Sequence, residues 1–176
     1  MCTKFGLFIL FLTSILSWRP SKGPTATLFT STPGLDTIAI RKVLRAVNAL
    51  RARGCRCPDG SWFAPAPTLQ VDERLNAAAQ VHAEDMQRRN YFKHTTPEGR
   101  TPAHRVSQAG YSWAQVGENI AWGQPTPESV VESWRNSSGH CANMMNPAFL
   151  HMGIGRAGTY WVQVLAAPSS LLRRRP

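Results

Sequence analysis

The chain has 176 residues, 43% of them hydrophobic, and a formal net charge of +10. That length suits one domain of ordinary size, and that hydrophobic fraction excludes a chain that is disordered throughout. The basic residues are spread along the sequence and form no run interleaved with aromatic residues. The charge therefore predicts loose association with anionic surfaces and no specific nucleic-acid partner.

The N-terminus carries Lys4 followed by an apolar run over residues 5–16. This run is shorter than the roughly 20 apolar residues that a membrane-spanning helix needs, and it is typical of a secretory signal. We predict a signal peptide over residues 1–26, with an uncleaved anchor as the alternative. Export to the extracellular space or the periplasm would place the protein where disulfides persist.

Residues 19–35 are rich in Pro, Thr, Ser and Gly, and we predict a linker over residues 27–39. Asp36 is predicted to cap a first helix, which Gly54 ends. The apolar residues of this helix recur at helical spacing: Ile40, Val43, Leu44, Val47 and Leu50.

A loop rich in Pro and Gly follows, and Asp72 is predicted to cap a second helix that reaches about Tyr91. His82 shares a face of this helix with apolar residues, so we expect it to pack inside rather than to bind a ligand. The later elements are a short helix near 102–109, strand and loop over 110–126, a helix capped by Thr126, and a hairpin with strands 153–156 and 160–165.

Helices thus come first and a small antiparallel sheet comes late, which predicts an α+β fold. We expect the folded domain to occupy residues 40–168, followed by a basic tail over 169–176.

Three segments place ionisable residues in turns rich in Gly or Ser: "YFKHTTPEG" with His94, "GENIAWG" with Glu118, and "WRNSSGHC" with His140. Two imidazoles and one carboxylate are a common zinc-binding set that leaves a fourth position open for water. The three residues are far apart in the sequence, so their spacing alone does not prove that they meet.

The motifs "AAAQVHAEDM", "YFKHTTPEGR", "GENIAWG", "SSGHCANMMNPAF" and "YWVQVL" occur in this order. Together they resemble the CAP superfamily of cysteine-rich secretory proteins, venom antigens and plant pathogenesis-related proteins, most closely its secreted bacterial branch. The resemblance implies an α-β-α sandwich with a small antiparallel sheet between helices. It also implies a central cavity that holds two His and one or two Glu, where some members bind zinc.

By this resemblance, His94 and His140 match the two cavity histidines, and Glu118 matches the cavity glutamate of the Gly-Glu-Asn motif. Animal and plant members have a second glutamate at the position of Ser137, so a hydroxyl would replace it here. Asn119 either contributes a hydrogen bond to the cavity or stabilises its own loop.

Cys141 directly follows His140, and we expect the two side chains to diverge because the segment is predicted to be extended or irregular. Bacterial members often pair the cysteine after the second cavity histidine with one in the loop after the first helix. The resemblance therefore implies a disulfide from Cys57 to Cys141, with Cys55 as the alternative partner. A zinc site formed by all three cysteines is the competing interpretation.

The resemblance favours a secreted binding or interaction module whose His/Glu cavity holds a divalent metal such as zinc. The unknown ligand would be a lipid, a peptide or a cell-wall component. The alternative is a zinc-dependent, peptidase-like hydrolase in which Glu118 acts as general base on a metal-bound water. The sequence has no H-E-x-x-H motif, so it would not be an ordinary zinc peptidase.

Overall fold

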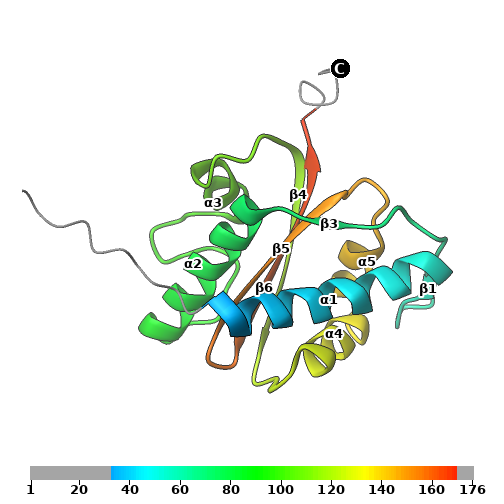
Figure 1. The fold of residues 1–176 in the computed structure, drawn as a ribbon, viewed down its shortest axis with the longest axis horizontal. Helices are drawn as coiled ribbons and strands as arrows, with labels where there is room; N and C mark the ends of the chain where they lie inside the picture. The colour runs from blue at the N-terminus through cyan, green and yellow to red at the C-terminus, as the bar shows by residue number, and fades with distance from the viewer. Residues whose placement is uncertain (1–32, 170–176) are drawn as a thin grey trace, which may run out of the picture. The chain divides into compact units, whose positions relative to one another are not determined.

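The computed structural model describes residues 33–169, in which helices lie on both faces of a four-stranded sheet (Figure 1). The strand order is β3-β5-β6-β4. The strands are β3 Gln70–Val71, β4 Trp113–Trp122, β5 His151–Ala157 and β6 Tyr160–Pro168. The predicted α+β class and sandwich architecture are confirmed. One detail differs, because the two-residue strand β3 pairs parallel with β5 while the other pairs are antiparallel.

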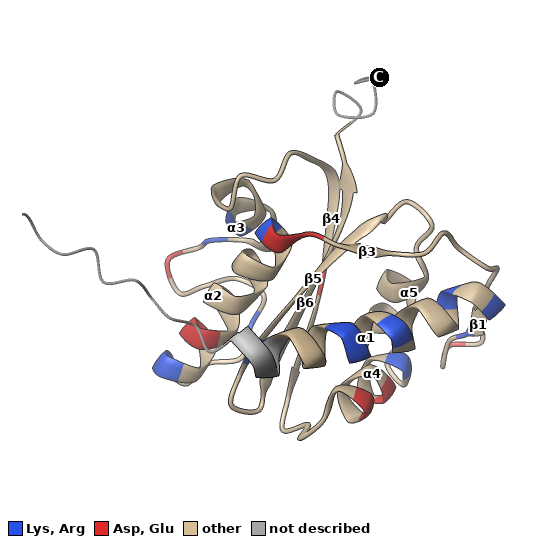
Figure 2. Ribbon diagram, viewed as in Figure 1, with Lys and Arg blue, Asp and Glu red and all other residues tan. Residues whose placement is uncertain are grey.

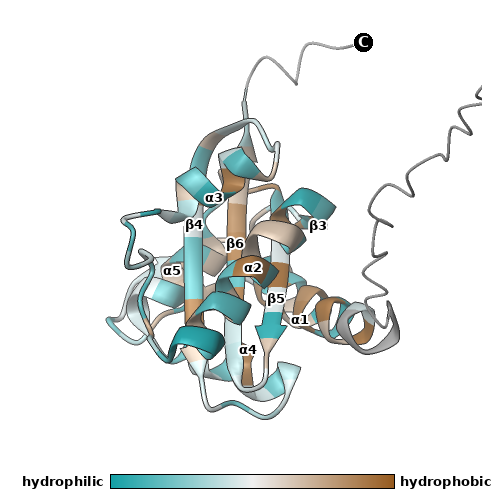
Figure 3. Cartoon of the chain, turned by 90° about the vertical axis from the view of Figure 1, so that its left-hand side faces the viewer, coloured by the Kyte–Doolittle hydropathy of each residue, from teal (hydrophilic) through white to brown (hydrophobic). Residues whose placement is uncertain are grey.

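The five helices of the described region form the two outer layers. One face of the sheet is covered by α1 Pro33–Arg53, α4 Pro127–Arg135 and α5 Ser138–Met145, and the other by α2 Glu73–Arg89 and α3 Pro102–Gln108. Each layer has its own hydrophobic core, and Trp161 and Val162 of β6 point into different cores. The central strand β6 is therefore buried on both faces, and Figure 3 shows hydrophobic residues along it.

Helix α1 begins at Pro33, so Asp36 lies inside the helix and the prediction that it is the N-cap is wrong. The helix also extends into the segment predicted as linker. Proline is favoured in a first helical turn because its φ is already helical and it needs no partner for an N–H group. Gly54 ends the helix as predicted, with a φ of 76°.

The predicted signal peptide and residues 170–176 of the predicted tail lie outside the described residues. Within residues 33–169, none of the helices is both long and apolar enough to cross a membrane.

The predicted caps of α2 and α4 are confirmed. The Asp72 side chain accepts a hydrogen bond from the Arg74 N–H at 2.9 Å, and Thr126 forms a capping box with Ser129. Helix α2 stops slightly earlier than predicted, because Asn90 takes the left-handed conformation with a φ of 52°. The loop between α1 and α2 contains a small hairpin, β1 Cys55–Arg56 and β2 Trp62–Phe63, that was predicted as irregular.

Helix α2 packs against β5 at two glycines. A Cβ atom on Gly153 would lie 2.1 Å from the Leu75 carbonyl carbon, and one on Gly155 would lie 2.3 Å from that of Ala79. Such distances are far below van der Waals contact, so only glycine lets the backbones approach this closely.

The same helix also covers the part of β5 that extends beyond β3. The Asn76 side-chain oxygen accepts from the Ile154 N–H at 2.8 Å, and that of Gln80 accepts from the Arg156 N–H at 2.9 Å. Two amides one helical turn apart thereby replace the hydrogen bonds of a missing neighbouring strand.

Arg51 of α1 is fully buried, and no carboxylate within residues 33–169 pairs with it. Its guanidinium donates to four backbone carbonyls at 2.6–2.9 Å, those of Pro67, Met144, Asn146 and Phe149. Burial lowers the pKa of Arg51 from its usual value. These bonds fix the end of α5, the helix that carries His140, against α1.

Candidate functional site

Glu118 lies in the middle of β4 with a side chain that is only 2% exposed. Its Oε1 accepts a hydrogen bond from His94 Nδ1 at 2.9 Å, and its Oε2 accepts from Arg105 Nη2 at 2.6 Å. Both carboxylate oxygens are thus engaged by cationic or ring N–H donors, as a buried carboxylate requires.

Arg105, which was not predicted from the sequence, is a buried member of this site. It belongs to α3, whose Thr101 cap accepts from the His104 N–H. Its Nη1 donates to the Arg100 carbonyl at 2.9 Å while Nη2 holds Glu118. A single arginine in a short helix gives no sequence signal that separates a buried side chain from an exposed one.

His82 packs inside as predicted and is fully buried. Its Nε2 donates to the Lys93 carbonyl at 3.0 Å and lies 3.9 Å from Glu118 Oε1. Burial is the main cause that lowers the pKa of His82, so the ring is neutral at neutral pH. It therefore anchors the loop that carries His94, a role that was not predicted.

The His94 side chain is 49% exposed and lies at the opening of the site. Because a carboxylate oxygen only accepts, the hydrogen bond to Glu118 places the ring proton on Nδ1. The lone pair of the neutral ring is then on Nε2, which makes no hydrogen bond in the described region. Glu118 thus orients His94 from behind and leaves its reactive nitrogen free.

An open cavity of about 390 Å³ lies in front of this pair. Its lining includes His94, Glu118, Thr101, Gly117 and Asn143. Gly117 has a packing reason to be glycine, because its Cβ would lie 2.9 Å from the Phe149 ring.

His140 is half-buried on α5. Burial is the main cause that lowers the pKa of His140, and the positive charge that His94 carries when it is protonated lowers this pKa further. The side-chain amide of Asn119 donates to the His140 carbonyl at 3.1 Å and accepts from Asn143 at 2.9 Å. Asn119 therefore ties α5 to β4 and positions His140 through the backbone.

Ser137, the other predicted contributor, is the half-buried N-cap residue of α5, without a side-chain cap bond. Its hydroxyl makes no hydrogen bond to the predicted histidines or to Glu118 within residues 33–169. The structure therefore joins His94 to Glu118 by a hydrogen bond, and His140 is close enough to His94 for the two rings to interact electrostatically. Ser137 joins none of these three residues through a side-chain hydrogen bond in the described part of the chain.

The described part of the chain holds no group of three His, Cys, Asp or Glu side chains placed to bind a metal ion. At the candidate site, both carboxylate oxygens of Glu118 are already engaged in hydrogen bonds. A zinc site with Glu118 as a third donor does not fit this arrangement. Of the three predicted metal ligands, only the imidazoles of His94 and His140 then remain as donors for a metal.

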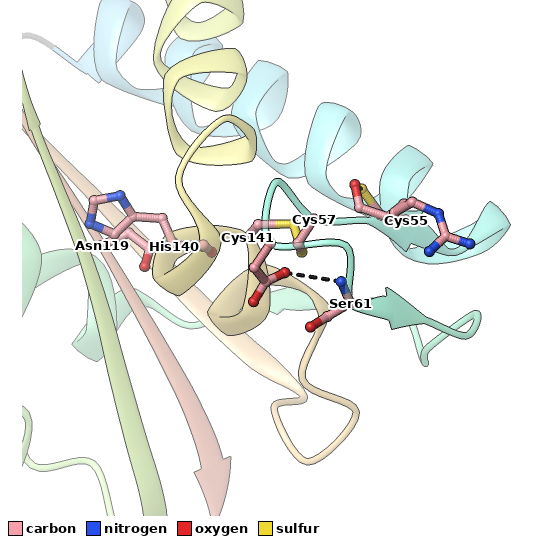
Figure 4. The surroundings of a disulfide bond; sticks show 8 residues. Cys55, Cys57, Ser61, Asn119, His140 and Cys141 are labelled. Carbon is pink, nitrogen blue, oxygen red and sulfur yellow. Dashed lines mark hydrogen bonds between the residues drawn. A yellow bond between two sulfur atoms is a disulfide. The ribbon is translucent and has the colours of Figure 1, made fainter.

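The disulfide joins Cys57 to Cys141, with a Cα–Cα distance of 5.9 Å, and Cys55 is buried and free. This confirms the pairing that the resemblance implied. The segment after Ser137 is helical, however, and the prediction that it is extended or irregular is wrong. Adjacent helical residues still diverge by about 100°. Figure 4 shows the His140 ring and the disulfide on different sides of α5.

Lys and Arg residues are distributed over several elements, as the coloured ribbon of Figure 2 shows. Several are paired with acids, among them Lys42 with Glu128 at 3.2 Å and Arg89 with Glu98 at 2.6 Å. Glu98, which follows His94 by only four residues in the sequence, is thus the partner of a surface ion pair.

Comparison with known proteins places this arrangement in a family. The model of the cysteine-rich secretory protein family, CAP, matches residues 44–165. The chain is 36% identical over 149 residues to the uncharacterized protein YkwD of Bacillus subtilis, covering 84% of this chain and 54% of YkwD. It therefore spans about half the length of this relative.

Two solved structures are similar in fold. An extracellular protein containing an SCP domain from Bacillus anthracis superposes with a TM-score of 0.65 at 26% identity, over 74% of this chain and 41% of that one. An outer surface protein of Borrelia burgdorferi gives 0.60 at 20% identity, over 76% of this chain and 92% of that one, and shows the fold alone. The family match covers well over half of the sequence, so this chain belongs to the cysteine-rich secretory protein (CAP) family and is similar to its bacterial members.

Proposed function

We propose that the protein is an exported binding module whose ligand enters the cavity in front of His94 and Glu118. The observation that carries this proposal is the buried Arg105–Glu118–His94 chain of hydrogen bonds, which holds a half-exposed imidazole with a free Nε2. A fixed imidazole at the mouth of an open cavity is pre-organised to bind a polar group or a metal.

The lining favours a polar ligand. Beside Pro102, Ala103, Val116 and Gly117, the cavity lining contains imidazole, carboxylate, hydroxyl and amide groups, from His94, Glu118, Thr101 and Asn143. These groups suit a peptide or a cell-wall fragment, which carry hydrogen-bonding groups along their length, better than the acyl chain of a lipid. Loose association with anionic surfaces through the basic residues would add to retention at a cell wall.

A divalent metal such as zinc would be held by His94 and His140, with Glu118 acting on His94 from behind. A carboxylate that orients a histidine ligand increases its basicity, and its loss usually weakens metal binding 10- to 100-fold. When bound, the metal would polarise a ligand oxygen. Two protein donors bind more weakly than the three or four of a structural zinc site.

The test of the metal proposal is a calorimetric titration of the full chain with zinc alone. We expect His94→Ala and His140→Ala to weaken binding at least tenfold and the exposed control His104→Ala to leave it unchanged. A Glu118→Gln variant should retain part of the affinity. Equal zinc binding by the wild type and both cavity variants would exclude this site, and no binding by the wild type would exclude the metal.

The binding-module proposal has a separate test. Sedimentation with purified peptidoglycan should retain the wild type and lose His94→Ala, while His104→Ala sediments as the wild type does. Equal sedimentation of all three would show that the cavity does not bind this polymer.

Export is part of the proposal, because Lys4 and the apolar run over 5–16 precede the domain. Extracellular and outer-surface proteins among the structural neighbours support it. The mature N-terminus is expected between about residues 18 and 27. N-terminal sequencing checks this, and exported material that begins at Met1 would point to an anchor.

A hydrolase is the second candidate, and the His94–Glu118 pair favours it. A buried carboxylate behind an imidazole is the arrangement that prepares a histidine to take a proton from an attacking water. The base would then be His94 Nε2 and not Glu118, whose oxygens are engaged. Turnover of a peptide panel by the wild type and its loss in His94→Ala would support hydrolysis; equal turnover by both would exclude it.

A further inference from the structure

Strand β4 lies at one end of the strand order, with β6 as its neighbour (Figure 3). An edge strand presents backbone N–H and C=O groups to which no second strand hydrogen-bonds. On the opposite side of the sheet, side-chain amides of α2 cover such groups, because they accept from the N–H groups of Ile154 and Arg156. The register of the sheet decides which groups of β4 are left without a partner.

The backbone groups of successive residues in a strand point to opposite sides, so pairing on one side fixes the direction of every other residue. The Ile154 N–H points to α2 and away from β6, so Gly155 faces β6 and hydrogen-bonds with its partner Val162. The next residue of β6, Gln163, therefore faces β4, where it pairs with Asn119. The backbone groups of Asn119 thus point toward β6.

By the same alternation, Gly117 also faces β6, whereas Val116 and Glu118 point their backbone groups outward. The Glu118 carbonyl agrees with this direction, because it accepts from the side-chain amide of Asn143 at 3.3 Å. No group within residues 33–169 hydrogen-bonds to the N–H or C=O of Val116 or to the N–H of Glu118. Two donors and one acceptor therefore remain at strand spacing along this edge.

The open cavity of about 390 Å³ lies directly outside these groups, because Val116, Gly117 and Glu118 all line it. Its walls come from both outer layers of the fold. Thr101, the cap of α3, is on one side, and Asn143 of α5 is on the other. A space that contacts both layers and the strand between them lies at the edge of the sheet, in the position that a further strand would occupy.

We infer that an extended peptide segment binds in this cavity as an additional strand beside β4, an inference that rests on the proposed function and specifies its ligand. A peptide backbone carries C=O and N–H groups at the same spacing as β4, so it matches both free donors and the free acceptor. The hydroxyl groups of a polysaccharide do not repeat with a strand's spacing. Successive side chains of the added strand point alternately toward His94 and toward Asn143.

A second copy of this chain is the other polypeptide that could pair with the edge. Its own β4 lies between the same walls, with α3 and the His94 loop on one face and α5 on the other. Edge-to-edge pairing of two copies would bring these walls against each other. A single extended segment is one strand thick and fits between them, so the structure favours a separate peptide as the occupant.

Amide hydrogen exchange of the isotope-labelled full chain, followed by NMR, tests the inference. In the free protein, the amides of Val116 and Glu118 should exchange faster than that of Gly117, which the ladder with β6 protects. The probe is acetyl-Thr-Val-Thr-Val-Thr-amide, whose β-branched residues favour an extended chain. When about nine-tenths of the sites are occupied, exchange at Val116 and Glu118 should be about tenfold slower, with no change at Gly117.

A matched control peptide has the same side chains on an N-methylated backbone, which cannot donate hydrogen bonds and cannot approach a strand edge. It should bind about fivefold more weakly or worse, as the loss of one hydrogen bond predicts. Val116→Pro removes an outward N–H that the fold does not use, so this variant should fold and bind the probe about tenfold more weakly. Val116→Thr should bind as the wild type does. If the proline variant does not fold, the comparison of the two peptides decides alone.

Equal binding of the two peptides, no slowing of exchange at Val116 and Glu118, or slow exchange there in the free monomer would each overturn the inference. Protection that appears only as the chain dimerises in sedimentation velocity would assign the edge to a second copy instead. Failure of the proposed function is distinguishable. Peptidoglycan sedimentation that requires His94, without protection by the probe, would retain the binding module and exclude strand addition. Protection by the probe without sedimentation would retain strand addition and exclude that polymer.

Discussion

Arg105 Nη2 lies 2.6 Å from Glu118 Oε2, and both side chains are at least 95% buried. This pair joins α3 to β4 beneath the open cavity and fixes the carboxylate that orients His94.

Removing one partner of this pair would leave a buried charge without compensation. We expect Arg105→Met to lower the free energy of unfolding by about 3–5 kcal/mol, the usual cost of breaking a buried ion pair. The double variant Arg105→Met/Glu118→Gln should be more stable than Arg105→Met alone, because no unpaired charge remains. Urea denaturation checks both, with the exposed Arg100→Met as a control that stays within about 0.5 kcal/mol of the wild type. If Arg105→Met had the same free energy of unfolding as the wild type, the Arg105–Glu118 pair would make no contribution to stability.

The contact of β5 with α2 depends on the absence of a side chain at Gly153. We expect Gly153→Ala to destabilise the fold by about 3 kcal/mol or more, because the added methyl would enter the backbone of α2. Gly139, inside α5 with open space around it, is the matched control. There alanine should be neutral or stabilising by up to about 1 kcal/mol, through its higher helix propensity. Similar thermal midpoints for the two variants would contradict the close approach of helix and sheet.

The disulfide closes a long loop, since Cys57 and Cys141 are 84 residues apart in the sequence. We expect Cys141→Ala to cost up to about 4 kcal/mol by freeing the unfolded chain. The Cys55→Ala control should retain the bridge and most of the stability, because Cys55 is not part of it. Non-reducing peptide mapping should find the Cys57–Cys141 linkage in both the wild type and Cys55→Ala. Three free thiols that hold zinc would instead support the competing metal site.

The free energy of unfolding should fall when the buried His82 and the half-buried His140 become protonated. Burial lowers the pKa of both His82 and His140 in the folded state, so the unfolded chain binds protons first. The contribution of these neutral histidines to the free energy of unfolding is therefore complete above about pH 6.5, the ordinary pKa of histidine. This contribution is lost as the pH falls from that value through the lower pKa of the folded state. Urea midpoints measured between pH 7 and 5 should decrease. His140→Gln should reduce the slope, whereas His104→Gln, at an exposed position, should leave it unchanged; equal slopes in all three would refute the assignment.

Local signals in the sequence predicted several of the points at which helices begin and end. Asp72 and Thr126 cap their helices because a cap needs only a side-chain oxygen and the next few N–H groups. Gly54 ends α1 for an equally local reason, its positive φ. The start of α1 was mispredicted because Asp36 is a plausible cap, while Pro33 three residues earlier is an equally good first-turn residue.

The candidate site was predicted through family motifs, which identify His94, Glu118 and His140 by their neighbours in the sequence. Periodicity alone could not have brought these residues together, because they come from a loop, a strand and a helix. It also could not give their roles. Glu118 lines the cavity but is not a free base there, because Arg105 of α3 engages its second oxygen while the first orients His94.

The sequence by itself determined the family, the α+β class and several helix ends, because these depend on motifs and on contacts between near neighbours. Only the tertiary structure decided which groups are buried against one another. Arg51 is satisfied by carbonyls near α5, Gly153 admits the backbone of α2, and Arg105 occupies the second oxygen of Glu118. Each of these depends on elements that meet only after folding, and burial then makes every unpaired polar atom costly enough to fix a specific partner.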